Sequence, residues 1–321
     1  MLAHIRRAAC CLSVILAVSA WSGPASAQKL TVLLDWFVNP DHGPLIVAQE
    51  RGYFADAGLE VEFVQPADPN DPPKLVAAGR GDIAVSYQPQ LHLQVEAGLP
   101  LVRIGTLVAT PLNALVALRD GPVDSVADLQ GRKVGYSIGG FEDAVLGAML
   151  ERHGVSLDEV ELINVNFALS PALVSGEVDA VIGAFRNFEL NQLEILGQPG
   201  RAFYPEENGV PAYDELIYVA HRDSLQKREL RSFLDAVEKA THWLINHPDE
   251  AWEVFKGFDP DLDDELNRRA WLDTLPRFAL RPYALDRGRY ARFARFLEDS
   301  GLIADPPPVA DYAVDLGAGG E

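Results

Sequence analysis

The sequence predicts an α/β protein that is organised as two lobes. Short β-rich runs alternate with helical segments from Lys29 onward, which is typical of parallel βαβ units with right-handed crossovers. A chain of 321 residues, 48% of them apolar, is also too long for one small core and favours two. A weak internal repeat around Gly79 and Gly176 supports the same division.

The first 27 residues have the three parts of a secretory signal peptide. Arg6 and Arg7 are followed by an apolar run from Ala8 to about Ala20 and by Ala25-Ser26-Ala27 as the cleavage site. The apolar run is shorter than the roughly 20 residues that a transmembrane helix needs. We therefore expect cleavage before Gln28 rather than an uncleaved anchor.

Composition excludes several classes of function. The only cysteines, Cys10 and Cys11, leave with the signal peptide, so the mature chain has no disulfide, thiolate nucleophile or cysteine metal ligand. Without the two signal-peptide arginines, 25 basic side chains face 47 acidic ones, a net charge of −22. This charge disfavours a nucleic-acid partner and an anionic membrane surface.

The βα series begins directly after the signal peptide. We expect strands at residues 30–34, 61–64, 82–86 and 102–108, and helices at 44–57, 73–78 and 89–97. Pro44 suits the first turn of the first helix and Gly58 suits its C-terminal end. A second series has strands at residues 133–136, 160–165 and 180–184.

The repeat relates the two series. Lys74 to Val85 reads KLVAAGRGDIAV and Pro171 to Ile182 reads PALVSGEVDAVI. Each has a helix end, a glycine, two residues, an aspartate and a β-run, and Asp82 and Asp179 occupy equivalent places. Helix–glycine–strand joints are common in α/β proteins, so the repeat has weight only together with the second series.

Two further β-runs, Asn113 to Leu118 and Glu215 to His221, lie between the series and are candidates for hinges that cross between the lobes. The predicted division is residues 28–112 and 216–321 for lobe 1 and residues 113–215 for lobe 2. Beyond residue 221 we expect helices at 225–246, 248–256 and 263–273. We expect the glycine-rich tail after Pro308 to be disordered.

The loop Leu33 to Pro44, LLDWFVNPDHGP, joins the end of the first strand to the first helix. Ligands of open α/β sheets bind at such ends. Trp36 offers a stacking face, and Asn39 and His42 offer hydrogen-bonding groups, which suits a neutral or cationic heteroaromatic ring. The alternatives are packing of Trp36 between lobes, a turn at Asn39 and helix capping by His42. For Asp35 we favour orientation of the loop backbone.

Two other segments also follow a predicted strand and precede a helix, as the loop from Leu33 to Pro44 does. Tyr87 and Gln88 follow the third strand and are expected to face the same cleft, although a tyrosine there also suits the core. Ser137, Gly139 and Phe141 lie between the first strand of the second series and a helix. They resemble a backbone-amide cradle for an acceptor group, with a simple glycine turn as the alternative.

Several motifs in the mature chain resemble one known family. They are Leu33-x-Asp35-Trp36-x-x-Asn39-x-x-His42, Gly52-Tyr53-Phe54, Gly58-Leu59-x-Val61, Gly81-Asp82-Ile83-Ala84, Leu129-x-Gly131-x-Lys133-Val134-Gly135 and Gly183-Ala184-Phe185-Arg186-Asn187-Phe188-Glu189. They are similar to the ThiY and thiamine-pyrimidine-synthase-like family, whose bacterial members are periplasmic binding proteins of ABC importers for thiamine pyrimidine precursors. The resemblance implies a two-lobed periplasmic-binding-protein fold of type II, with the ligand cleft between the lobes.

The last motif contributes Asn187 and Glu189 to the expected ligand site. By the resemblance, Glu189 contacts the ligand, where a carboxylate accepts from an exocyclic amine and pairs with a protonated ring nitrogen. The alternative is a solvated glutamate at a helix start, which the helix dipole also favours.

The family also contains enzymes that build the pyrimidine from an active-site histidine and pyridoxal phosphate held by a lysine. At the corresponding place this chain has Ser86-Tyr87-Gln88, and the mature chain lacks the cysteine-rich segment of those enzymes. We therefore predict no enzymatic activity and no cofactor.

The sequence predicts a periplasmic, monomeric solute-binding protein. Its ligand is expected to be a formylated or hydroxymethyl aminopyrimidine that it delivers to an ABC permease and its ATPase. Alternatives are riboflavin, a sulfonate or nitrate, or a pyrimidine-synthase-like enzyme. An anion binder requires an arginine in the cleft, and Arg186 is the one obvious candidate.

Overall fold

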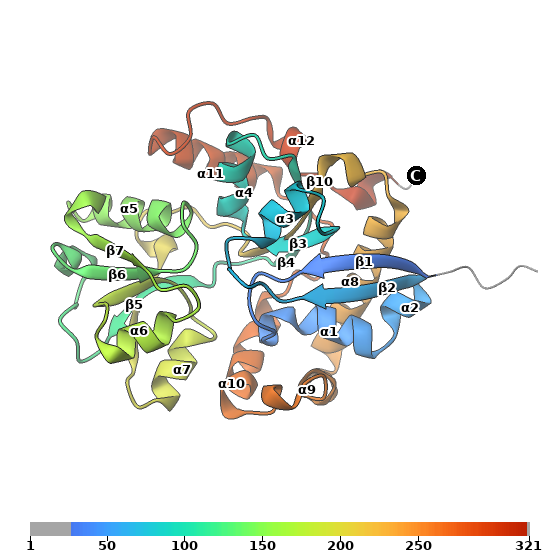
Figure 1. Cartoon of the computed structure of the whole chain (residues 1–321), viewed down its shortest axis with the longest axis horizontal. Coiled ribbons are helices and arrows are strands. Elements are labelled where there is room, and N and C mark those ends of the chain that lie inside the picture. Colours follow the sequence, from blue (N-terminus) through green and yellow to red (C-terminus); the bar gives the residue numbers. More distant parts are fainter. Residues whose placement is uncertain (1–26, 320–321) are drawn as a thin grey trace, which may run out of the picture.

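The computed structural model describes residues 27–319 and consists of two α/β lobes that lie side by side (Figure 1). The predicted signal peptide lies outside the described residues, apart from Ala27. Within the described part of the chain, no helix is both long enough and apolar enough to cross a membrane. The predicted fold class, α/β with two lobes, is confirmed.

The first lobe has a five-stranded sheet in which one strand, the fourth across the sheet, is antiparallel to both of its neighbours. In order across the sheet, the strands are β2 (Leu59–Val64), β1 (Gln28–Leu33), β3 (Ile83–Ser86), β10 (Leu216–His221) and β4 (Leu101–Val108). Strand β1 is parallel to β2 and β3, whereas β10 is antiparallel to β3 and β4.

The second lobe repeats this arrangement. Its strands, in order, are β7 (Glu161–Asn164), β6 (Lys133–Tyr136), β8 (Ala180–Phe185), β5 (Asn113–Leu118) and β9 (Gly200–Phe203). Strand β6 is parallel to β7 and β8, and β5 is antiparallel to β8 and β9. In both sheets the antiparallel strand follows directly after a crossing of the chain between lobes.

The internal repeat seen in the sequence corresponds to this structural duplication. Asp82 accepts a hydrogen bond from the backbone N–H of Thr31 at 3.0 Å, and Asp179 accepts one from Lys133 at the same distance. Each aspartate thereby ties the start of its own strand to the neighbouring parallel strand. The repeat is confirmed as two copies of one helix–glycine–strand unit.

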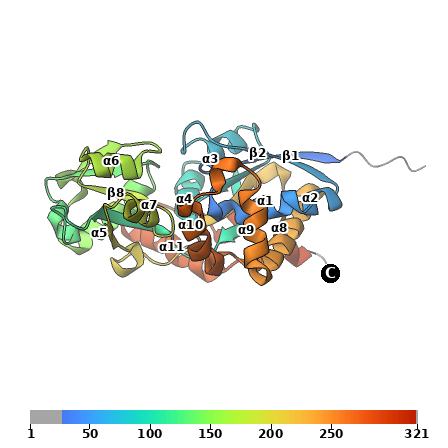
Figure 2. The same cartoon turned by 90° about the horizontal axis from the view of Figure 1, so that it is seen from below.

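Helices cover both faces of each sheet (Figures 1 and 2). Those of the first lobe are α1 (Gly43–Glu50), α2 (Tyr53–Asp56), α3 (Pro72–Ala77), α4 (Gln88–Glu96), α8 (Arg228–Asn246), α9 (Pro248–Lys256), α10 (Glu265–Thr274), α11 (Arg287–Asp299) and α12 (Val309–Tyr312). Those of the second lobe are α5 (Glu142–Arg152), α6 (Leu169–Ser175) and α7 (Glu189–Ile195). Figure 2 places α7 beside α10, where the two lobes meet.

Three expectations from the sequence are wrong in detail. The first helix is not continuous over 44–57, because Gly52 adopts φ +73° and separates α1 from α2. The two β-runs expected to cross between lobes are strands inside the sheets. The tail is not disordered as far as Gly319, since Tyr312 is buried and Val314 donates its N–H to the carbonyl of Arg103 at 3.0 Å.

The true crossings are short segments just before β5 and β10, and polar side chains join them. Glu215 accepts hydrogen bonds from the N–H groups of Leu112 and Asn113 at 2.5 and 2.9 Å. Arg186 donates to the carbonyls of the same two residues at 3.2 and 3.0 Å and forms an ion pair with Glu206. Hydrogen bonds therefore connect the two chain crossings to each other at the junction of the lobes.

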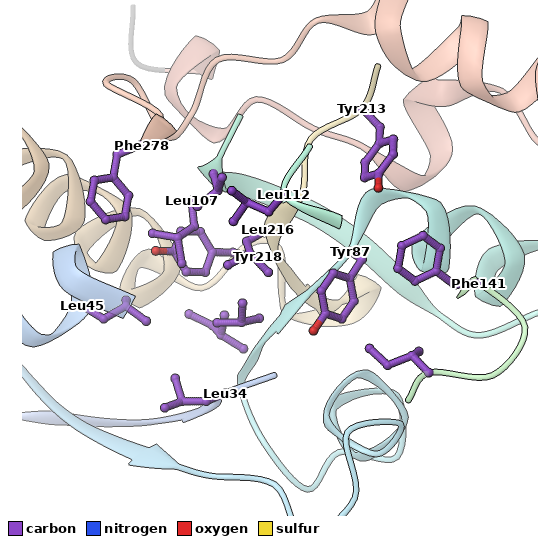
Figure 3. Close-up of a cluster of buried hydrophobic side chains, with 14 of the residues drawn as sticks. Leu34, Leu45, Tyr87, Leu107, Leu112, Phe141, Tyr213, Leu216, Tyr218 and Phe278 are labelled. Atoms are coloured by element: carbon purple, nitrogen blue, oxygen red, sulfur yellow. The ribbon is translucent and has the colours of Figure 1, made fainter. Parts of the chain in front are cut away.

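An apolar core runs from the first lobe through this junction into the second lobe. Leu34, Leu45 and Tyr218 pack beside the first sheet, and Figure 3 shows Tyr87 and Phe141 facing each other nearer the second lobe. The Tyr87 and Phe141 rings are stacked with centroids 5.5 Å apart. Because Tyr87 begins the turn into α4 and Phe141 the turn into α5, this contact joins the two lobes.

Candidate functional site

A cavity lies between the lobes, at the carboxyl ends of the parallel strands. Its empty space, including the mouth, measures about 410 Å³. The first lobe contributes Asp35, Trp36, Asn39, Asp41 and Tyr87. The second contributes Glu142 and Glu189 together with the apolar groups Ile138, Leu169, Gly183, Phe185 and Phe188.

The loop after β1 is held by a hydrogen-bonded capping arrangement. Asn39 accepts from the N–H of Asp41 at 2.8 Å, and its own N–H donates to Nδ1 of His42 at 3.3 Å. Since Nδ1 of His42 accepts, its Nε2 carries the proton and donates to Asp35 at 3.0 Å. The hydroxyl of Tyr87 donates to the other oxygen of Asp35 at 2.8 Å. Asp35 thus fixes the loop against α4 through two side chains rather than through the loop backbone.

Asp41 follows in the same loop and contacts the opposite lobe. Its Oδ1 accepts from Nδ2 of Asn187 at 2.7 Å and lies 3.1 Å from the hydroxyl of Thr274. Its Oδ2 is buried and has no hydrogen-bond partner among the described residues. Burial raises the pKa of Asp41 to about 6 against the opposing influence of His42 and Asn187.

Two glutamates close the cavity from the second lobe, each at the first residue of a helix. Glu142 accepts from the N–H groups of Ser137 and Ile138 at 2.7 and 3.1 Å, and Glu189 accepts from that of Phe185 at 2.6 Å. Burial raises the pKa of Glu142 to about 8 and that of Glu189 to about 7, because the backbone donors offset only part of the desolvation.

Aromatic side chains form the remaining walls. Trp36 meets Phe167 of the second lobe edge to face, with centroids 4.6 Å apart, and Phe37 packs on the same ring. Tyr87 also contacts Phe185 with centroids 6.4 Å apart. Flat apolar walls with carboxyl groups at the edges suit a planar ring that carries hydrogen-bond donors.

Four of the sequence-predicted site residues line the cavity: Trp36, Asn39, Tyr87 and Glu189. The other six do not line it: Gly139 is exposed, and the remaining five are buried behind the wall. His42 supports Asp35, Phe141 stacks on Tyr87, and Asn187 holds Asp41. Gln88 is fully buried, where its side chain contacts His92 and accepts from the N–H of Asp214 at 2.9 Å.

The expected backbone-amide cradle is occupied by the chain itself. The amides of Ser137 and Ile138 bind Glu142, and the amide of Gly139 donates to Asn70 at 3.1 Å. The hydroxyl of Ser137 donates to the carbonyl of Asn166. These amides are therefore used to hold a carboxylate and a neighbouring loop.

Sequence reasoning missed two acidic residues of the wall, Asp41 and Glu142, as well as its apolar groups. Asp41 lies in the loop that we singled out, and Glu142 follows the Gly-Gly-Phe turn directly. A search for acidic residues at helix starts after parallel strands would have found Glu142, since Glu189 stands at the equivalent place of the βα unit formed by β8 and α7.

The lining carries four carboxyl groups, from Asp35, Asp41, Glu142 and Glu189, and no lysine or arginine. Arg186, the candidate for an anion site, is engaged by Glu206 and by backbone carbonyls at the crossings. In the described part of the chain, acidic and histidine side chains form no group that could hold a metal ion. The site therefore favours a ligand with donors or positive charge over an inorganic anion.

Comparison with known proteins agrees with the motifs. The family described as NMT1/THI5 like matches residues 39–251. The chain belongs to the NMT1/THI5-like family. A Haemophilus influenzae protein named for thiamine biosynthesis is 53% identical over 290 residues, covering 90% of this chain and 92% of that protein. A formylaminopyrimidine-binding protein of Halalkalibacterium halodurans is 36% identical, covering 76% of each chain.

More distant members of the family are enzymes. A Legionella pneumophila protein named as a 4-amino-5-hydroxymethyl-2-methylpyrimidine phosphate synthase is 27% identical, covering 85% of this chain and 88% of that protein. The relatives of higher identity given above carry binding or biosynthesis names.

Solved structures share the fold at low identity. A Candida albicans protein with the generic periplasmic binding protein fold has a TM-score of 0.69 at 20% identity, covering 89% of this chain and 96% of that one. The alkanesulfonate-binding protein of Xanthomonas axonopodis pv. citri has a TM-score of 0.71 at 14% identity, covering 90% and 99%. The two-lobed periplasmic-binding-protein fold is thereby confirmed.

Proposed function

We propose that this protein is a periplasmic substrate-binding protein of an ABC importer and that it binds an aminopyrimidine precursor of thiamine. The observation that carries the proposal is the cavity, which has four carboxyl groups between aromatic walls and no basic side chain among its lining residues. A planar aminopyrimidine presents N–H donors at its edge and two apolar faces, so it matches both features. The ligand named for the Halalkalibacterium halodurans relative, formylaminopyrimidine, belongs to this class.

Glu189 is the residue that reads the amine edge in this proposal. It is only 9% exposed, and one carboxyl oxygen is already held by the N–H of Phe185, which fixes its orientation. Because that hydrogen bond fixes the carboxyl group of Glu189, the position of its second oxygen is fixed as well. Trp36 and Tyr87 provide the faces between which the ring lies, and Asn39 shapes the loop that carries Trp36.

The protein is proposed to act by closing on the ligand and making no bond. Residues 28–112 with 216–321 form one moving lobe, and residues 113–215 form the other. The predicted signal peptide is proposed to direct the mature protein to the periplasm. There we propose that it acts as a monomer and delivers the ligand to a permease with its ATPase. These assignments rest on the family and on the sequence.

The synthase alternative lacks a suitable residue in the cavity. Pyridoxal phosphate requires a lysine for its Schiff base, and no lining residue is a lysine. The residues beside Tyr87, where the enzymes carry that lysine, are Ser86 and Gln88, both buried. We expect no Schiff-base absorbance when pyridoxal phosphate is mixed with the protein, and its appearance would support the enzyme instead.

Thermal unfolding of residues 28–321 against a ligand panel tests the proposal. The panel contains formylaminopyrimidine, hydroxymethyl aminopyrimidine, thiamine, riboflavin, taurine and nitrate. A ligand at 100 times its dissociation constant adds about 2.7 kcal/mol to the free energy of unfolding. We expect this shift for an aminopyrimidine and its loss in Glu189→Gln, which keeps the shape but replaces an acceptor by a donor.

Glu177→Gln is the matched control, because Glu177 is exposed in the same lobe and should leave the shift unchanged. A shift with taurine or nitrate alone would reject the ligand class. A shift that survives in Glu189→Gln would reject the assigned role of that residue while keeping the ligand.

A further inference from the structure

Asp41 combines three properties that separate it from the other carboxyl groups of the cavity. It is 1% exposed, it lines the cavity, and its Oδ2 has no hydrogen-bond partner among the described residues. The oxygens of Asp35 are both engaged, by His42 and by Tyr87. A buried carboxylate oxygen without a donor costs free energy, so its retention points to a donor that arrives with a ligand.

The other oxygen of Asp41 is held from two elements. Asn187 belongs to the second lobe and donates through Nδ2 both to Asp41 and, at 2.7 Å, to the hydroxyl of Thr274 in α10. The hydroxyl of Thr274 also lies 2.7 Å from the carbonyl oxygen of Ala270, which is closer than the 3.1 Å to Oδ1 of Asp41. Thr274 therefore donates to Ala270 and accepts from Asn187, which fixes the amide with its nitrogen toward Asp41.

Asp41 and Glu189 line the same cavity from opposite lobes. The charge of Asp41 contributes to the raised pKa of Glu189, after burial, so the two carboxyl groups are close enough to interact. One comes from each lobe. A single donor group with two N–H bonds, placed between them, would satisfy both oxygens and relieve their mutual repulsion.

Resting on the proposed function, we propose that Asp41 is a second specificity-determining residue, whose free Oδ2 accepts one N–H of the ligand's exocyclic amine while Glu189 accepts the other. The amine then bridges the lobes. Because the opposite oxygen of Asp41 is bonded to Asn187, the residue that reads the amine also joins the lobes around it. A ring with a methyl group in place of the amine leaves both carboxyl oxygens without a donor.

Asp41→Asn tests this assignment because it preserves shape. The new amide must direct its oxygen to Asn187, whose nitrogen is a donor, and so directs its own NH₂ into the cavity. We expect the preference for formylaminopyrimidine over its analogue with methyl in place of the exocyclic amine, measured as a ratio of dissociation constants by calorimetry, to fall by about 10- to 100-fold. Should Asp41→Asn not fold, Asp41→Ser withdraws the same acceptor and is measured in the same way.

Thr274→Val is the matched control. It removes a hydroxyl on the Asn187 side of Asp41 and leaves Oδ2 of Asp41 in place, so both ligands should weaken by a common factor and the ratio should stay at the wild-type value. An unchanged ratio in both Asp41 variants would overturn the inference. Wild-type protein that binds neither compound would overturn the proposed function instead, which keeps the two failures distinct.

Discussion

Four carboxyl groups at the cavity and the crossings have pKa values above their ordinary range, and burial is the main cause for each. The pKa is raised to about 8 for Glu142, about 7 for Glu189 and Glu215, and about 6 for Asp41. The helix starts and backbone donors at Glu142 and Glu189 lower the pKa but do not overcome desolvation. The ligand-free site therefore retains protons near neutral pH.

The stability of the ligand-free protein should consequently fall as the pH rises from 5 to 8. In this window the unfolded chain has released these protons, since its carboxyl pKa values are near 4, while the folded protein still binds them. Raising the pH then favours unfolding, and one pKa unit corresponds to about 1.36 kcal/mol. Denaturant unfolding at pH 5 and pH 8, at constant ionic strength, measures the difference.

Glu142→Gln serves as the comparison for this pH dependence. It removes the group with the highest of these four values, so the loss of stability between pH 5 and pH 8 should be smaller than in wild type. Equal slopes in the two proteins would show that Glu142 is ionised throughout, contrary to its burial.

At the level of single residues, the sequence predicted which side chains line the cavity better than it predicted the contacts that those side chains make. Trp36, Tyr87 and Glu189 line the cavity, because each follows a parallel strand where the fold places ligands. Asp41 was missed because its partners, Asn187 and Thr274, lie 146 and 233 residues away in the chain. No local pattern reports a contact between lobes.

Among the secondary-structure elements, the fit of β8 against the start of α5 is the most restrictive. Gly183 in β8 has φ +94°, and a Cβ built on it would lie 2.3 Å from Oε1 of Glu142. Its N–H donates to the side chain of Asn113 at 3.0 Å, beside an irregularity in the pairing of β5 with β8. A side chain here meets both a backbone restriction and a fixed carboxyl group.

Gly183→Ala should therefore cost more than backbone strain alone. Gly176→Ala is the control, since Gly176 has φ +75° but no atom within 4 Å of its Cβ position. We expect the control to lose about 1–2 kcal/mol and Gly183→Ala to lose more, with ligand binding abolished because Glu142 must move. Chemical denaturation of both variants gives the difference. Equal losses of unfolding free energy in the two variants would mean that the Glu142 side chain moves aside without a cost in stability.

Element boundaries followed from the sequence where local chemistry dictates them. The predicted helix 248–256 matches α9, which begins at Pro248. The first helix was predicted as continuous because Pro44 suits its first turn and Gly58 suits its end, yet the left-handed backbone at Gly52 starts a second helix. The strands β5 and β10 were identified, but their place inside the sheets depends on pairing with β8 and β3, which no local signal specifies.

For the whole molecule, the decisive feature is that the lobes touch on more than one side of the cavity. On one side Asn187 binds Asp41, and α7 contacts α10 through Asn191 and Asp273 at 2.8 Å. On another, Asn70 of the first lobe accepts from the N–H of Gly139 and donates to the carbonyl of Ser137, both at 3.1 Å. The duplicated lobes were foreseen from the repeat, whereas this closed arrangement was not, because each contact joins distant segments.

Asn70→Ala should shift the ligand-free protein toward an open arrangement. It removes both hydrogen bonds on its side of the cavity, each worth about 1 kcal/mol, so the ratio of closed to open forms should fall roughly 10- to 30-fold. X-ray scattering without ligand should give a larger radius of gyration than wild type, and saturating formylaminopyrimidine should restore the wild-type value. Asn246→Ala is the control, because Asn246 donates only within its own helix, to the carbonyl of His242. An equal radius of gyration for ligand-free Asn70→Ala and ligand-free wild type would contradict this prediction. The contacts of Asp41 and of α7 with α10 would then suffice to keep the lobes together.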